Sequence, residues 1–212
     1  TKAKDGRHDE AIADYSEAIN LNPQDAVAYS NRGAANFALG RSREAIADFT
    51  LAIQLDPKHA MAFVLRGQAH VILREFERGI ADFGEAIRLS PENVQAIFAR
   101  GVAKQTLGES TNALVDFTRV ISLQPDHIDA LYNRGTAKFQ QGNLWGAVVD
   151  FDKVVEIQPS AEDALNARGQ IYHQLGRLDE AQKDFTRAVD LNPNIVNCLF
   201  SGALSALRGY DS

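Results

Sequence analysis

Every proline in the sequence lies at the same step along the chain. The prolines are 34 residues apart, and they are Pro23, Pro57, Pro91, Pro125, Pro159 and Pro193. A fixed period of about 20–50 residues is typical of a solenoid or array, in which each repeat packs against its neighbours. The period continues without insertion across the 212 residues. It therefore restricts the chain to a repeat architecture.

Other residue columns keep the same step. A glycine column holds Gly33, Gly67, Gly101, Gly135 and Gly169, and an aromatic column holds Tyr15, Phe49, Phe83, Phe117, Phe151 and Phe185. A column of small residues holds Ala11, Ala45, Ala113, Ala147 and Ala181, with Gly79 as its variant. Small residues such as Gly33 and Ala45 predict points where two helices cross closely.

Within one period the apolar residues follow helical spacing. In residues 44–55, and again in 26–39, they recur at steps of three and four, which places them on one helix face. Gly40 separates the two stretches at a position typical of a helix C-cap. The same column holds Gly108, Gly142 and Gly176, with Arg74 as the exception. Because Pro57 cannot continue a helix interior, each period is predicted to be two antiparallel helices joined to the next pair by a turn.

The pattern resembles the tetratricopeptide repeat, whose repeat of the same length carries Trp, Leu-Gly, Tyr, Ala, Phe and Pro at set positions. The resemblance implies an all-α fold, a right-handed superhelical solenoid of antiparallel helix pairs. We expect a single solenoid over residues 1–212. Its full repeats are 26–59, 60–93, 94–127, 128–161 and 162–195, with partial repeats at 1–25 and 196–212.

Two charged columns run in register with the repeats. The arginines replace the family's leucine before each glycine and are Arg32, Arg66, Arg100, Arg134 and Arg168. The aspartates are Asp14, Asp48, Asp82, Asp116, Asp150 and Asp184. The arginines alone would suit an acidic partner, but the matching acids favour an internal ladder of Arg–Asp pairs between neighbouring helices.

Trp145 interrupts a column that otherwise holds Arg43, Glu77, Thr111 and Asp179. An exposed indole in such a position can anchor a partner protein. It can also fold back over Leu144 and cover the edge of its own helix, which is the interpretation we favour.

The composition argues against several classes of function. A net charge of −6 disfavours non-specific binding to nucleic acid or anionic lipid. No apolar run approaches the roughly 20 residues that cross a bilayer, and residues 1–30 contain no secretory signal, which favours the cytoplasm over secretion. The single cysteine, Cys198, excludes an internal disulfide.

No group of residues has the spacing that catalysis or metal binding requires. None of the five histidines has a cysteine or another histidine three or four residues away. His173, on an expected inner helix, lacks a partner to orient it as a catalytic base. The sequence also contains no glycine-rich phosphate loop or nucleophile motif. We therefore predict no enzymatic activity, no metal and no cofactor.

The resemblance further implies that the first helix of each repeat lines a concave groove that binds a peptide. The predicted lining residues are Asn31, Phe37, Met61, Val64, Leu65, Gln68, Ile72, Phe98, Val102, Asp129, Tyr132, Asn133, Asp163, Asn166, Gln170 and His173. Among them, Val64, Leu65, Ile72 and Phe98 are expected to face solvent. The lining is apolar at its N-terminal end and rich in amides and carboxylates at its C-terminal end, without Lys or Arg. It therefore favours a segment with hydrophobic residues at one end and Lys or Arg at the other.

These observations predict a protein–protein interaction scaffold that binds a peptide segment in its groove. Because the repeats begin and end within a period, the alternative is the targeting region of a larger enzyme whose catalytic part lies elsewhere. A glycosyltransferase, kinase or phosphatase would fit that alternative. RNA binding by a related helical-repeat family is disfavoured by the strict period and the acidic balance.

The last residues form an uncharged apolar stripe. Residues 194–207 contain no charged side chain, and Val196, Leu199, Phe200, Leu204 and Leu207 recur at helical spacing. An isolated solenoid needs a polar terminal repeat, because its last helix otherwise exposes an apolar face. We predict that two chains self-associate through this stripe, unless further sequence covers it.

Overall fold

The computed structural model of the chain describes residues 2–192, with side chains from residue 6 onward. Within that range it contains 11 helices and no strand, which confirms the predicted all-α repeat fold. The chain divides into two compact units, unit 1 over residues 1–123 and unit 2 over residues 124–212. A single solenoid across both units stays a prediction.

The helices begin and end where the period of the sequence predicts. Unit 1 contains α1 (Lys2–Leu21), α2 (Ala26–Ala38), α3 (Ser42–Leu55), α4 (Ala60–Ile72), α5 (Phe76–Leu89), α6 (Val94–Thr106) and α7 (Ser110–Leu123). Unit 2 contains α8 (Ile128–Gln140), α9 (Leu144–Ile157), α10 (Glu162–Gln174) and α11 (Leu178–Leu191). From α2 onward, each pair has a first helix of 13 residues and a second helix of 14.

Local chemistry sets the ends of the helices. The Asp25 side chain caps α2 by accepting hydrogen bonds from the backbone N–H groups of Val27 and Ala28, at 2.9 and 3.0 Å. Gly40 adopts a φ of 75° between α2 and α3, a left-handed conformation that ends a helix and suits glycine. Arg74 has a φ of 61° at the same place between α4 and α5. The exception in the glycine column therefore makes the same turn.

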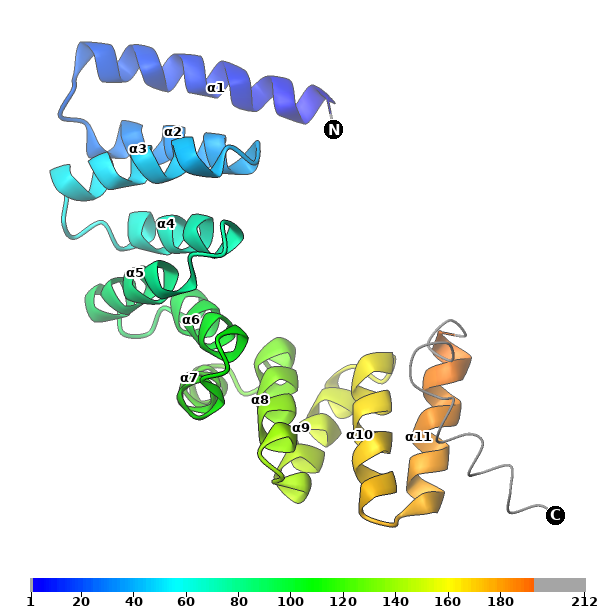
Figure 1. Cartoon of the computed structure of the whole chain (residues 1–212). Helices are drawn as coiled ribbons and strands as arrows, with labels where there is room; N and C mark the ends of the chain where they lie inside the picture. The colour runs from blue at the N-terminus through cyan, green and yellow to red at the C-terminus, as the bar shows by residue number, and fades with distance from the viewer. Residues whose placement is uncertain (1, 193–212) are drawn as a thin grey trace. The chain divides into compact units, whose positions relative to one another are not determined.

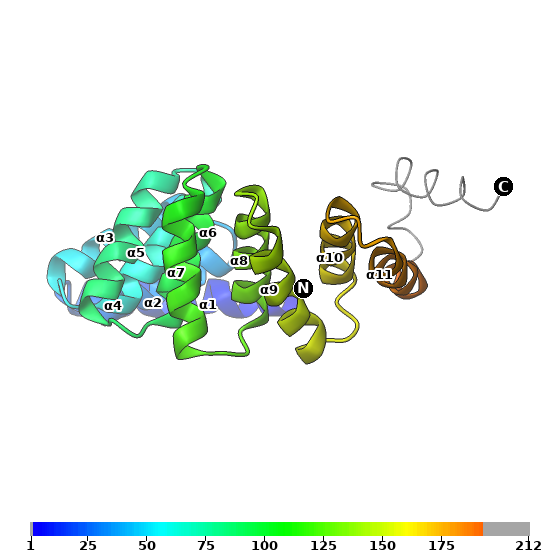
Figure 2. The same cartoon turned by 90° about the horizontal axis from the view of Figure 1, so that it is seen from below.

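In unit 1 the helices stack in chain order from α1 to α7 (Figure 1). Two second helices contact the first helix of the next repeat, α3 with α4 and α5 with α6. The first helices also contact each other, α2 with α4 and α4 with α6. In unit 2, α8 likewise contacts α10, and α10 lies beside α11 (Figure 2). We call the surface formed by the first helices the inner face, made of α2, α4 and α6 in unit 1 and of α8 and α10 in unit 2.

The core of each repeat lies between its two helices. Four phenylalanines of the aromatic column are at most 1% exposed, namely Phe49, Phe83, Phe117 and Phe151. Burying a side chain of this size contributes about 1.5–3 kcal/mol. A Cβ atom on Gly33 would lie 2.9 Å from Cε1 of Phe49, so the two helices approach too closely for any other residue without a shift. This confirms the close crossing predicted from the glycine column.

The charged columns form the predicted ladder between the helices of each pair. Arg66 donates from Nε and Nη2 to the two carboxylate oxygens of Asp82, at 2.9 and 2.7 Å. The equivalent pairs are Arg32–Asp48, Arg100–Asp116, Arg134–Asp150 and Arg168–Asp184. All five aspartates are buried. Because removing one partner of a buried pair typically costs about 3–5 kcal/mol, the ladder fixes the geometry of each repeat.

Several of these arginines also bind the preceding repeat. From Nη1, Arg32 donates to Ser16 at 3.1 Å, Arg66 to Thr50 at 3.1 Å and Arg168 to Asp152 at 2.7 Å. Arg100 departs from this pattern because the corresponding residue, Gly84, has no side chain to accept a hydrogen bond. Among the described residues, Arg100 donates only to Asp116.

Candidate functional site

The inner face of unit 1 carries exposed apolar side chains. Val27 on α2 is 59% exposed, and Met61 and Ile72 on α4 are 46% and 61% exposed. Asn31 is also exposed, and Gln68 is half-buried. Three of the predicted lining residues, Asn31, Met61 and Ile72, are therefore exposed to solvent on the first helices, as is Val27.

Larger side chains form the base of this face. Phe37 and Leu65 are half-buried and pack on the core around Phe49. Phe98 is half-buried with its ring centroid 5.9 Å from that of Phe117, and Val102 is half-buried on the same helix. These half-buried side chains thus lie beneath the exposed residues of unit 1, and their packing on the core fixes their positions.

One expected exposure is wrong. Val64 is 0% exposed, so it belongs to the core and does not face solvent. The same column holds Ser30, at 5% exposed, and the half-buried rings of Phe98 and Tyr132. Because neighbouring first helices contact each other, a short side chain in this column is covered, whereas an aromatic ring extends beyond the contact.

The inner face of unit 2 is polar. Asp129 on α8 and Asp163 on α10 are exposed, as is His173, while Asn133 and Gln170 are half-buried. These five residues were all predicted as lining, and the structure places them on the two first helices of unit 2. Asn133 Nδ2 donates to the backbone oxygen of Asp129 at 2.7 Å, which leaves the Asp129 carboxylate available to other groups.

Tyr132 lies between the core and the polar face of unit 2. Its ring meets that of Phe151 edge to face, with centroids 5.5 Å apart and an interplanar angle of 73°. Burial raises the pKa of Tyr132, and the negative charge of Asp163 on the next first helix raises it further. The phenol therefore remains protonated, and its ring lies within the field of the Asp163 carboxylate.

Asn166 is the buried member of the predicted lining in unit 2. It is 8% exposed, and its Oδ1 atom has no hydrogen-bond partner among the residues that the structure describes. A buried acceptor without a partner costs about 1–3 kcal/mol and is rare in folded proteins. The sequence indicated an asparagine on the inner face but not this lack of a partner.

The buried aspartates have additional partners that sequence analysis missed. Lys104 binds Asp116 and Lys138 binds Asp150, both at 2.8 Å. In the same column, Asn36 Nδ2 donates to Asp48 at 3.2 Å. These residues stand where the family pattern has tyrosine, and their recurrence four residues after each arginine was the signal that could have revealed them.

His70 in that column joins the ladder to a loop. Its Nδ1 atom lies 2.6 Å from Oε2 of Glu75, and its Nε2 atom lies 3.9 Å from Oδ2 of Asp82. The hydrogen bond with His70, followed by one from Arg78, lowers the pKa of Glu75. This histidine is therefore a buried structural partner of two carboxylates.

Trp145 is held on the surface of unit 2. It is 54% exposed, and the guanidinium of Arg177 lies 5.8 Å from its ring centroid. The same guanidinium lies 5.8 Å from the ring centroid of Tyr172. A cation–π contact with the next repeat thus fixes the indole, and its predicted role as a cover for Leu144 stays a prediction.

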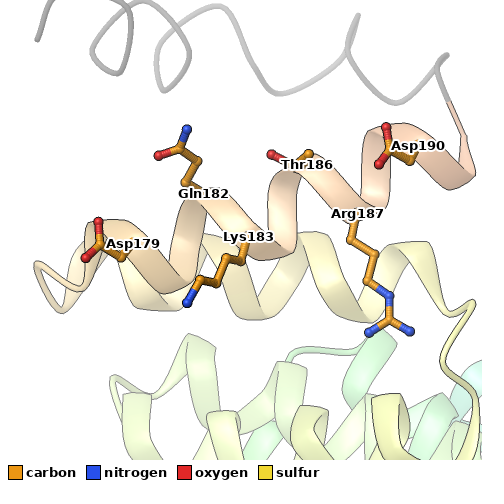
Figure 3. Close-up of a pocket in the computed structure, with 6 residues that line it drawn as sticks. All are labelled: Asp179, Gln182, Lys183, Thr186, Arg187 and Asp190. Atoms are coloured by element: carbon orange, nitrogen blue, oxygen red, sulfur yellow. The ribbon is translucent and has the colours of Figure 1, made fainter. Parts of the chain in front are cut away.

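An open hollow along α11 lies away from the predicted lining. Its residues are Asp179, Gln182, Lys183, Thr186, Arg187 and Asp190 (Figure 3). Arg187 Nη2 also donates to the backbone oxygen of Pro159 at 2.8 Å, so this cation secures the preceding loop. The mixed charges along this one helix form no arrangement of nucleophile and base.

The described residues contain neither a candidate metal site nor a membrane-spanning helix. No group of three or more His, Cys, Asp or Glu residues in the described part of the chain is arranged to hold a metal ion. None of the described helices combines the length and apolar character that crossing a membrane requires. The predicted self-association residues, Val196, Leu199, Phe200, Leu204 and Leu207, lie outside the described residues.

The fold defines a helical-repeat protein built from stacked antiparallel helix pairs. A family profile described as "TPR repeat" matches residues 3–40 and 135–176, and one described as "Tetratricopeptide repeat" matches 26–59 and 162–195. A second tetratricopeptide repeat profile matches residues 94–127. Together these matches cover more than half of the sequence, and the chain belongs to the tetratricopeptide repeat family.

Solved structures share this fold. YrrB, described as a TPR protein with an unusual peptide-binding site, has a TM-score of 0.77 at 23% identity, with 93% of this chain and 98% of YrrB covered. MamA has a TM-score of 0.74 at 22% identity, with 77% and 96% covered. MamA from Desulfovibrio magneticus RS-1 has a TM-score of 0.75 at 19% identity, with 80% and 96% covered. At these identities the likeness concerns the fold, and comparison with curated proteins finds no match.

Proposed function

We propose that the chain is a protein-interaction scaffold whose first helices bind a segment of another protein. The observation that carries the proposal is the exposure of Val27, Met61 and Ile72 on the inner face of unit 1. Each side chain of this size gains about 1.5–3 kcal/mol when it is fully buried. A peptide segment lying across α2 and α4 would cover them. YrrB, which has a similar fold, is described as having a peptide-binding site, and this supports the proposal.

The rigidity of the helix pairs favours such binding. The half-buried Phe37 and Leu65 pack on the core, and the Arg32–Asp48 pair fixes α2 against α3. A surface that is already ordered loses little conformational entropy when a ligand binds. Most of the entropic cost therefore falls on the segment, which suits an extended peptide of modest affinity.

The test is selection of a random dodecapeptide library displayed on phage against the immobilised chain. We expect wild type to enrich peptides with apolar residues, and a Met61→Asp, Ile72→Asp variant to lose this enrichment. Val115→Asp is the matched control, because Val115 is 67% exposed but lies on the second helix α7. These sites are preferred to Leu65 and Phe98, whose half-buried side chains also support the fold.

Far-UV circular dichroism shows whether each variant keeps its helices. A wild-type chain that enriches no peptide contradicts the proposal. Loss of enrichment in Val115→Asp, but not in the Met61→Asp, Ile72→Asp variant, also contradicts it, because binding would then involve the second helices.

A further inference from the structure

Two carboxylates are exposed on the inner face of unit 2. Asp129 on α8 and Asp163 on α10 are exposed and occupy equivalent positions of successive repeats. The cations of the same helices are bound elsewhere, Arg134 and Lys138 to Asp150, and Arg168 to Asp152 and Asp184. Within the described part of the chain, neither Asp129 nor Asp163 has an ion-pair partner. Their charge therefore acts on whatever approaches this face.

A buried acceptor lies beside these carboxylates. Asn166 follows Asp163 by three residues on α10, so the two side chains project from the same side of the helix. Asn166 is 8% exposed, and within residues 6–192 its Oδ1 atom has no hydrogen-bond partner. Tyr132 holds the equivalent position on α8, and its longer side chain reaches solvent. Asn166 thus belongs to the same column as Ser30 and Val64, and its acceptor is covered in the free chain as their side chains are.

The aromatic ring of Tyr132 lies near Asp163 as well. The ring of Tyr132 is held by Phe151 and lies near enough to Asp163 to be affected by its charge. Carboxylates, a carbonyl oxygen and the face of an aromatic ring all attract a cation. The two carboxylates repel an anion, and the only hydrogen-bond donors in the group are the phenol of Tyr132 and the amide nitrogen of Asn166.

We propose that Asp129, Tyr132, Asp163 and Asn166 bind the cationic side chain of a Lys or Arg residue carried by the bound segment. Its N–H groups donate to the carboxylates and to Asn166 Oδ1, which turns toward the inner face when the cation arrives. The inference rests on the proposed function, because it assigns a residue type to a segment bound by the first helices. The free chain thus keeps a buried acceptor unsatisfied, and the ligand supplies the donor.

The experiment compares peptides obtained from the phage selection described above. Each selected peptide is synthesised with its Lys or Arg residues and again with norleucine at those positions. Wild type is expected to bind the cationic form roughly tenfold more tightly, as charged hydrogen bonds allow. Asp163→Asn is expected to reduce that ratio to about twofold or less, and added salt to reduce it in wild type. Asp190→Asn on α11 is the matched control, since Asp190 is also exposed.

Asn166→Leu separates a binding role from a structural role. The variant removes an unsatisfied buried acceptor, so the free chain is expected to melt at a higher temperature. The same variant is expected to lose part of the preference for the cationic peptide. A lower melting temperature, or an unchanged preference, would overturn the role of Asn166.

The outcomes distinguish this inference from the proposed function. Selection of peptides that bind equally well with norleucine overturns the cation site and leaves the scaffold proposal in place. A preference for the cationic form that Asp190→Asn reduces as much as Asp163→Asn overturns the site as well, because the effect would then arise from net charge. Failure to select any peptide contradicts the proposed function itself.

Discussion

Units 1 and 2 share one framework and differ in their inner faces. The arginine and aspartate of each repeat meet at almost the same distance in both units, 2.7 Å for Arg66–Asp82 and 2.6 Å for Arg134–Asp150. At the second position of the first helix, however, α4 carries Met61 and α8 carries Asp129. Residues between helices are thus fixed by packing, whereas residues on the inner face are free to vary. The fold and the chemistry of binding are therefore encoded in separate columns.

The largest expected effect tests whether the frameworks are equivalent. Asp116 and Asp150 are 2% and 1% exposed, and each binds an arginine and a lysine. Substituting either with alanine leaves two cations without their counter-ion. We expect each variant to lose about 3–5 kcal/mol of unfolding free energy, measured by urea denaturation. Asp190→Ala, an exposed control, should change it by less than about 0.5 kcal/mol. A loss in one unit of less than half that in the other would show that the frameworks differ.

A smaller effect tests how tightly the helices of each unit cross. A Cβ atom on Gly67 would lie 2.8 Å from Cε1 of the buried Phe83, while one on Gly135 would lie 3.1 Å from Cζ of Phe151. We expect Gly67→Ala to destabilise the fold by about 1–3 kcal/mol through overpacking. Gly135→Ala should be close to neutral, because the better helix propensity of alanine, about 0.5–1 kcal/mol, offsets a milder contact. Thermal unfolding measures both, and the reverse order would contradict the distances.

The smallest effect depends on pH and concerns unit 1 alone. Because the hydrogen bond with His70 lowers the pKa of Glu75 in the folded chain, the carboxylate stabilises the fold above about pH 4.5. That contribution is lost as the pH falls through the lowered folded-state pKa. Glu75→Gln should therefore melt below wild type at pH 6 and approach it at lower pH. Asn143, at the same loop position in unit 2, does not ionise, so Asn143→Gln should show a difference independent of pH. A constant difference for Glu75→Gln would refute the linkage.

The sequence predicted the framework well because it repeats. The steps of three and four residues located each helix, and the register of Arg66 with Asp82 predicted the ladder that the structure contains. The turn at Arg74 followed the glycines of its column. Because the same residue column recurs in every repeat, a single exception such as Arg74 does not obscure the pattern.

The inner face was harder to predict because its details depend on distances between helices. Helical spacing predicted correctly which side of α4 carries Val64. It did not predict that the neighbouring first helices lie close enough to cover this side chain. The contact of His70 with Glu75 crosses a turn and has no counterpart in the other repeats that the structure describes. The unsatisfied oxygen of Asn166 is a property of its surroundings, which no residue pattern expresses.

Because of Gly84, the hydrogen bonds between successive repeats of unit 1 are not equivalent. Arg32 and Arg66 each join three helices, whereas Arg100 joins two, because Gly84 on α5 offers no acceptor. In a linear array the cooperativity of unfolding depends on the coupling across each joint between neighbours. At the joint between α5 and α6, Arg119 of α7 instead makes an exposed hydrogen bond to the backbone oxygen of Pro91, and we expect it to transmit less of that coupling than the part-buried bonds of Arg32 and Arg66. Under a stretching force on its ends, or in mild denaturant, unit 1 is expected to lose the contact between α5 and α6 first. The repeats on either side would then behave as two short folding segments.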